Sequence, residues 1–207
     1  MPAELKTPFP GAAFDVVVMA ASAGGLRAVS KIVAELPRDF PACVLLVQHL
    51  DRRHRSLMAD ILGRRTAMEV CEATAGAPIR PSVFYTAPPD RHLLLNPDLT
   101  LLLAQTELVH FVRPSADLLF ESAAACCRDR TLGVVLTGTG SDGNMGVKAI
   151  RKMGGTVIVE DPATAEFNGM PQAALRTGCY DFVQPLAEIA NALCRLVIVP
   201  PEGEEAA

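Results

Sequence analysis

Continuous apolar runs along the chain alternate with segments of helical periodicity. Four short runs predict buried strands at residues 15–19, 43–47, 132–136 and 156–159. A run that is apolar at nearly every position is typical of a strand covered on both faces. Residues 180–183 predict a further strand at the edge of the sheet.

Between these runs, apolar residues recur at the three- to four-residue spacing of amphipathic helices. This pattern predicts helices that begin near residues 26, 57, 116 and 144. Ser56 and Ser115 stand where a side chain would cap the second and third helix. Strand–helix alternation predicts an α/β fold, a three-layer α/β/α sandwich whose doubly wound sheet is mostly parallel.

Turn residues set residues 83–103 apart from this pattern. Pro88-Pro89-Asp90 and Asn96-Pro97-Asp98 separate short apolar pieces there, which predicts a small antiparallel addition. Prolines and Gly11 predict a flexible leader at 1–13, and residues 200–207 predict an acidic tail. We therefore expect a single domain over residues 14–199.

Composition narrows the classes of function. The 207 residues carry a net charge of −4, which argues against a nucleic-acid binder. Its apolar runs are too short to cross a bilayer, and no signal-peptide pattern begins the chain, so we expect no membrane insertion and a cytoplasmic location. The six cysteines and four histidines lack the spacing of a metal site. We expect neither a metal nor a cofactor.

Polar residues directly follow three of the predicted strands, where ligands bind in open parallel sheets. Ser22 lies in a turn with two glycines that resembles the Gly-x-Ser-x-Gly turn of nucleophilic serines, with Ala20 at the first glycine. His49 follows the second strand and Asp142 the third. A histidine can take the proton of a serine, and an aspartate can orient that histidine. Although each residue alone also suits a helix cap or a loop edge, the three together predict a serine hydrolase.

A second motif supports a competing interpretation. Gly138, Gly140 and Gly143 form a Gly-x-Gly-x-x-Gly fingerprint between a strand and a helix, and Glu160 follows where a ribose-binding acid would fall. These residues predict a nucleotide-binding oxidoreductase. Asp142 argues against it, because a carboxylate beside the third glycine would repel a pyrophosphate.

Several separated motifs also give the chain a family resemblance, from about Asp15 to Val197. It resembles the catalytic domain of chemotaxis protein-glutamate methylesterases of the CheB type. The matching stretches are Ala20-Ala21-Ser22-Ala23-Gly24-Gly25, Gln48-His49, Ala87-Pro88-Pro89-Asp90-Arg91-His92, Arg113-Pro114-Ser115-Ala116-Asp117, Leu136-Thr137-Gly138-Thr139-Gly140-Ser141-Asp142-Gly143 and Phe167-Asn168-Gly169-Met170-Pro171.

This resemblance implies a function and assigns roles to residues. It implies Ser22 as nucleophile, His49 as general base and Asp142 as orienting acid, with an oxyanion hole made by the backbone N–H groups of Ala23 and Thr139. The implied substrate is a glutamate methyl ester on the methylated cytoplasmic helical domain of a chemoreceptor, and some members also deamidate receptor glutamines.

The chain departs from the family pattern at four positions and at its start. The family usually has glycine at Ala20, threonine at Ala23, histidine at Val112 and methionine at Thr139, which favours altered substrate choice over loss of catalysis. Well-known family members also carry an N-terminal receiver domain where this chain has about 14 residues. If the chain is complete, we expect a separate regulatory partner. A catalytically silent receptor-binding module is the remaining alternative.

Basic residues follow His49 closely. Arg52, Arg53 and Arg55, with Arg64 and Arg65, form either a solvated surface or a docking patch for an acidic receptor helix.

Overall fold

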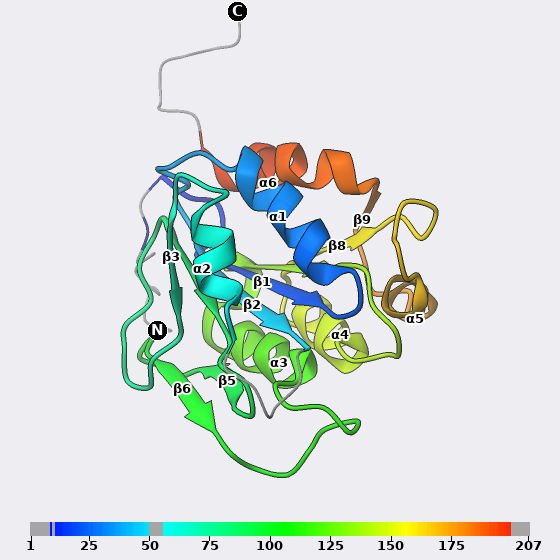
Figure 1. The fold of residues 1–207 in the computed structure, drawn as a ribbon, viewed down its shortest axis with the longest axis horizontal. Helices are drawn as coiled ribbons and strands as arrows, with labels where there is room; N and C mark the ends of the chain where they lie inside the picture. The colour runs from blue at the N-terminus through cyan, green and yellow to red at the C-terminus, as the bar shows by residue number, and fades with distance from the viewer. Residues whose placement is uncertain (1–8, 10, 50–55, 200–207) are drawn as a thin grey trace, which may run out of the picture.

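A computed structural model of the chain describes residues 9, 11–49 and 56–199. A seven-stranded sheet, parallel throughout, forms its centre (Figure 1). In spatial order its strands are β3 (Glu69–Glu72), β4 (Val83–Thr86), β2 (Cys43–Gln48), β1 (Val16–Ala21), β7 (Thr131–Val135), β8 (Thr156–Glu160) and β9 (Phe182–Gln184). The two remaining strands, β5 (His92–Leu95) and β6 (Leu101–Ala104), form an antiparallel pair.

Helices cover both faces of the sheet. One face carries α1 (Gly25–Glu35), α2 (Met58–Gly63) and α6 (Ile189–Val197), while the other carries α3 (Ala116–Cys127), α4 (Asn144–Lys152) and α5 (Gly169–Arg176) (Figure 1). Two short 3₁₀ helices, η1 (Arg128–Arg130) and η2 (Leu186–Glu188), join elements. The predicted three-layer α/β/α sandwich with a small antiparallel addition is confirmed.

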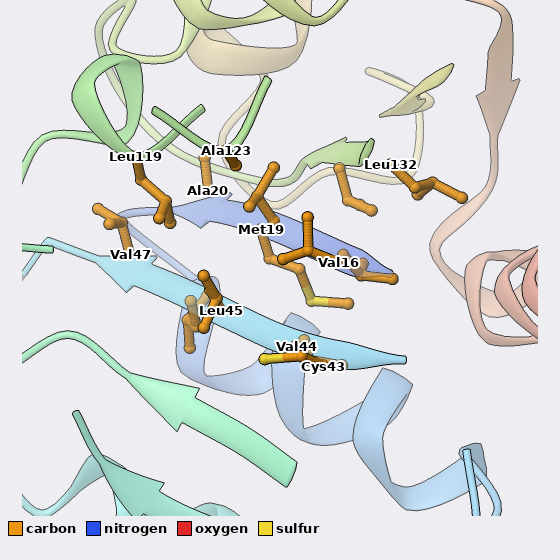
Figure 2. Packing of buried hydrophobic residues seen from close by; sticks show 14 of the residues in the cluster. Val16, Met19, Ala20, Cys43, Val44, Leu45, Val47, Leu119, Ala123 and Leu132 are labelled. Carbon is orange, nitrogen blue, oxygen red and sulfur yellow. The ribbon is translucent and has the colours of Figure 1, made fainter. Parts of the chain in front are cut away.

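The core explains why the central strands are uniformly apolar. All six residues of β1 and all six of β2 are buried, since helices lie above and below them. Leu119 and Ala123 of α3 pack on one side of β1, next to Ala20 (Figure 2). Burial of a leucine or valine side chain contributes roughly 1.5–3 kcal/mol, so these central strands hold the sheet edge in place.

The structure corrects one part of the strand assignment. Residues 83–86 form β4, which pairs in parallel with β2 and β3 and belongs to the main sheet. Only the later part of 83–103 enters the antiparallel pair. The edge strand β3 was not predicted, because its exposed Glu69 and Glu72 interrupt the apolar pattern.

The segment that precedes β1 contacts the residues that follow α6. Phe9 is buried, and Ala12 pairs with Ile198 just after α6. The guanidinium of Arg130 bonds the Asp15 carboxylate at 2.7 and 2.8 Å and the Ala12 carbonyl at 2.8 Å. These contacts fasten the described residues before β1 to the sheet.

Candidate active site

Three polar side chains stand at the carboxyl edge of the sheet. Ser22 follows β1, His49 follows β2, and Asp142 lies between β7 and α4. Because β1 lies between β2 and β7, the serine comes from the middle strand and the other two side chains from its neighbours. Strand order therefore brings together His49 and Asp142, which are 93 positions apart in the sequence.

A hydrogen bond joins the histidine to the aspartate. His49 Nε2 lies 2.8 Å from Asp142 Oδ2, and these side chains are 14% and 4% exposed. When Nε2–H donates to the carboxylate, Nδ1 of the neutral ring keeps a free lone pair that can accept a proton.

Ser22 and His49 line one cavity of about 940 Å³. Within the described part of the chain, Ser22 Oγ has no hydrogen-bond partner. A contact between a nucleophile and its base often tightens only when substrate binds. The arrangement thus offers a proton acceptor and a hydroxyl in the same space.

The first turn of α3 holds the Asp142 carboxylate. Ser115 Oγ donates to Oδ1 at 2.9 Å, the Ala116 N–H donates to Oδ2 at 2.6 Å, and the Asp117 N–H donates to Oδ1 at 3.1 Å. Burial opposes ionisation, but the hydrogen bonds from His49 and these backbone groups outweigh it and hold the pKa of Asp142 below its ordinary value. Asp142 is therefore an anion able to stabilise a protonated His49.

This contact changes the predicted role of Ser115. Ser115 stands at the N-cap position of α3, but its side chain makes no cap bond and donates to Asp142 instead. The carboxylate of Asp142, from another part of the chain, accepts two of the free N–H groups of the helix start, those of Ala116 and Asp117. The predicted side-chain cap is wrong for this reason.

Sequence reasoning also missed the support behind Ser115. The Ser115 N–H donates to Nδ1 of the fully buried His92 at 3.1 Å. Arg113 binds Asp90 Oδ1 through two nitrogens, at 2.6 and 3.0 Å. These residues fall in two of the stretches that carry the family resemblance. Membership of those stretches was the sequence signal that could have identified them. The two stretches contact each other and brace the first turn of α3.

Gln48 connects the backbones of the serine and histidine loops. Its Nε2 donates to the Ser22 carbonyl at 2.6 Å and to the His49 carbonyl at 3.1 Å. Gly25 makes room for this side chain, because a Cβ there would lie 2.0 Å from Gln48 Oε1. One buried amide thus fixes the spacing between the two loops.

We predict that Gln48→Glu lowers kcat for ester hydrolysis by about 10²-fold, the cost of a small misplacement of reacting groups. Glutamate keeps the size of the side chain but places a carboxylate oxygen against two carbonyls, so the loops separate. Steady-state kinetics with a small chromogenic ester would measure the effect. Gln184→Glu, on the edge strand β9, is the control, and an unaltered kcat for Gln48→Glu would contradict the role.

Gly138, the first glycine of the fingerprint, serves packing in this structure. A Cβ on Gly138 would lie 2.3 Å from Met170 Sδ and 2.8 Å from the Ser22 Cβ, so only glycine lets this loop approach Ser22. Glu160 Oε2 accepts a hydrogen bond from the Thr137 N–H at 2.7 Å. The Ser22 N–H donates to the Thr137 carbonyl at 3.0 Å. Residues that suggested a dinucleotide site therefore position the serine turn.

A second buried carboxylate lies beside Asp142. Burial is the main cause that raises the pKa of Asp117 to about 6, and the charge of Asp142 also raises this pKa. The hydrogen bond from the Gly146 N–H and the nearby His110, 3.5 Å away, lower the pKa but do not cancel the rise. Because this folded-state pKa exceeds the unfolded value of about 3.9, the folded state holds more protons between these values. Its stability should fall as pH rises through that window.

We predict that Asp117→Asn removes this pH dependence. From about pH 4 to pH 7, the variant should gain about 1–3 kcal/mol of unfolding free energy relative to wild type. Urea unfolding at several pH values would measure it. Glu121→Gln, an exposed position on the same helix, is the control. A constant difference between Asp117→Asn and wild type would contradict the prediction.

The predicted basic patch can be placed only in part. Its residues 51–55 lie outside the described residues, while Arg64 and Arg65 are exposed just beyond α2. Across the described ranges, no group of three or more His, Cys, Asp or Glu side chains could hold a metal ion. No described helix is long and apolar enough to cross a membrane.

A serine, a histidine and an aspartate at the carboxyl edge of a parallel sheet define an α/β serine hydrolase. Comparison with protein families makes this class specific. The family model described as CheB methylesterase matches residues 17–193. The chain therefore belongs to the CheB methylesterase family, which confirms the resemblance predicted from its motifs.

Individual relatives agree with this assignment. A Leptospira interrogans protein is 38% identical over 88% of this chain and 95% of its own length. A Moorella thermoacetica protein named protein-glutamate methylesterase/protein-glutamine glutaminase is 39% identical, over 88% of this chain but only 44% of its own length. The crystal structure of the Thermotoga maritima CheB methylesterase catalytic domain superposes with a TM-score of 0.85 at 34% identity, covering 88% of this chain and 98% of that one. These comparisons do not support the oxidoreductase or the silent binding module.

Proposed function

We propose that this chain hydrolyses the methyl esters of glutamate side chains in chemoreceptors, in chemotaxis signalling. Ser22 is the nucleophile, His49 the general base and Asp142 the orienting acid. The observation that carries the proposal is the Asp142 carboxylate, which three donors from the start of α3 hold against His49. The names of relatives that cover the same domain support the substrate class.

The reaction follows from this geometry. His49 Nδ1 takes the proton of Ser22 as Oγ attacks the ester carbonyl, and Asp142 stabilises the imidazolium that forms. The imidazolium then protonates the departing methoxide, which leaves as methanol. The glutamyl group remains on Ser22 as an ester. Water, activated by the same nitrogen, hydrolyses that ester and releases glutamate. With a glutamine substrate, ammonia would leave in place of methanol.

The Ala23 and Thr139 N–H groups are proposed as the oxyanion hole. Ala23 follows the nucleophile, and Thr139 follows Gly138, which lies against Ser22. Neither N–H donates to another described residue, so both are available for a developing negative charge. Because backbone N–H groups supply these hydrogen bonds, the departures from the family pattern at Ala23 and Thr139 leave both donors in place.

The deciding experiment measures the products. The full chain would be incubated with a methylated cytoplasmic fragment of a chemoreceptor, and methanol and ammonia would be quantified separately. Methanol release supports methylesterase activity, and ammonia release from glutamine sites adds deamidase activity. Hydrolysis of small esters without either product would reject the proposed substrate. A receptor substrate of this kind implies a cytoplasmic location for the chain.

A further inference from the structure

A groove leads away from Ser22 along one face of α1. The cavity that holds Ser22 and His49 continues past Leu26, Ser30 and Ala34, which follow one another at four-residue spacing. Eight residues at 1.5 Å per residue make this wall about 12 Å long. Ile61 and Arg65 form the opposite wall, because α2 lies beside α1 on the same face of the sheet (Figure 1).

The described lining of this groove is cationic, although the chain as a whole has a net charge of −4. Arg27, Lys31 and Arg65 line it, with Glu166 as its one carboxylate. Arg27 lies 4.0 Å from Glu166, with 86% of its side chain exposed. Neither Lys31 nor Arg65 forms an ion pair with another described residue. Both side chains are exposed, so within the described part of the chain these two positive charges have no carboxylate partner.

Apolar contacts are available between the charges. Leu26 is 38% and Ile61 36% exposed, and they belong to the facing walls. A groove between two helices with apolar walls and charged rims suits an amphipathic helix, which has a diameter of about 10–12 Å. Carboxylates on that helix would meet the cations of the rim.

We propose that this groove binds an acidic α-helical segment of the substrate protein, the segment that flanks the esterified glutamate. The inference rests on the proposed function and specifies how its substrate is selected. Each completed hydrolysis leaves a glutamate carboxylate, so a helix with several such sites becomes more anionic as the reaction proceeds. Lys31 and Arg65 attract that charge, and Glu166 opposes it.

The test compares one enzyme on two substrates. The double variant Lys31→Glu/Arg65→Glu would be assayed on a methylated chemoreceptor cytoplasmic fragment and on p-nitrophenyl acetate. We expect the ratio of the two kcat/KM values, receptor over small ester, to fall about tenfold. At about 1 M salt, where the screening length is about 3 Å, the difference should largely disappear. Lys148→Glu, exposed on α4 across the sheet, should leave the ratio unchanged.

A second variant should change the ratio of kcat/KM values in the opposite direction, which structural damage would not do. Glu166→Gln keeps the side-chain size but removes the carboxylate, so the ratio should rise. An unchanged ratio in the double variant, an equal loss on both substrates, or an equal effect of Lys148→Glu would overturn the groove proposal. Wild-type enzyme that releases no methanol from receptor would instead overturn the proposed function.

Discussion

Ser22→Ala is expected to lower kcat/KM for methyl ester hydrolysis by on the order of 10⁴–10⁶-fold, as loss of a catalytic serine does in other hydrolases. In the proposed mechanism Ser22 Oγ forms the acyl-enzyme and gives its proton to His49, and an alanine can do neither. The turn itself should persist, because its bonds to Thr137 and Gln48 come from the Ser22 backbone.

A fluorophosphonate probe gives the direct measurement for this position. It should label wild type and spare Ser22→Ala. Ser30→Ala, on α1 and in the wall of the same cavity, should label like wild type. Labelling of Ser22→Ala, or methanol release within tenfold of wild type, would place the nucleophile elsewhere.

Asp142→Asn is expected to lower kcat by about 10⁴-fold, the loss seen when a triad aspartate becomes an amide. Each Asp142 oxygen accepts a backbone N–H, Oδ2 from Ala116 and Oδ1 from Asp117. An asparagine must therefore turn its NH₂ toward one backbone donor. If that NH₂ takes the Oδ2 position it also faces His49, and the ring must then carry its proton on Nδ1, where it cannot accept one from Ser22.

Ser115→Ala provides a graded comparison for this prediction. It removes one of the four donors to the carboxylate but keeps the charge, so we expect a loss of only about tenfold. Steady-state kinetics on a small ester, with thermal unfolding to show that each variant folds, would measure both changes. Equal losses for the two variants would contradict the assignment of the charge at Asp142 to catalysis.

The kinds of contact that each element makes explain which elements were predictable. The central strands were recognisable because burial on both faces demands apolar residues at every position. The edge strand β3 keeps polar residues, and β4 was grouped with its neighbours because turn residues follow it closely. Ser115 was misjudged because a serine before a helix fits a cap, and only the position of Asp142 shows where its hydroxyl donates.

The sequence alone determined the α/β class, the family and the three residue types that follow β1, β2 and β7, because periodicity and motif order are local properties of the chain. Tertiary structure decided which groups meet. Strand order placed Ser22 between the strands that carry His49 and Asp142, and a helix start 25–27 positions from Asp142 became the support for its charge. It also gave Gly138 of the glycine fingerprint a packing role, since only three-dimensional contact shows that a side chain at Gly138 would strike Ser22.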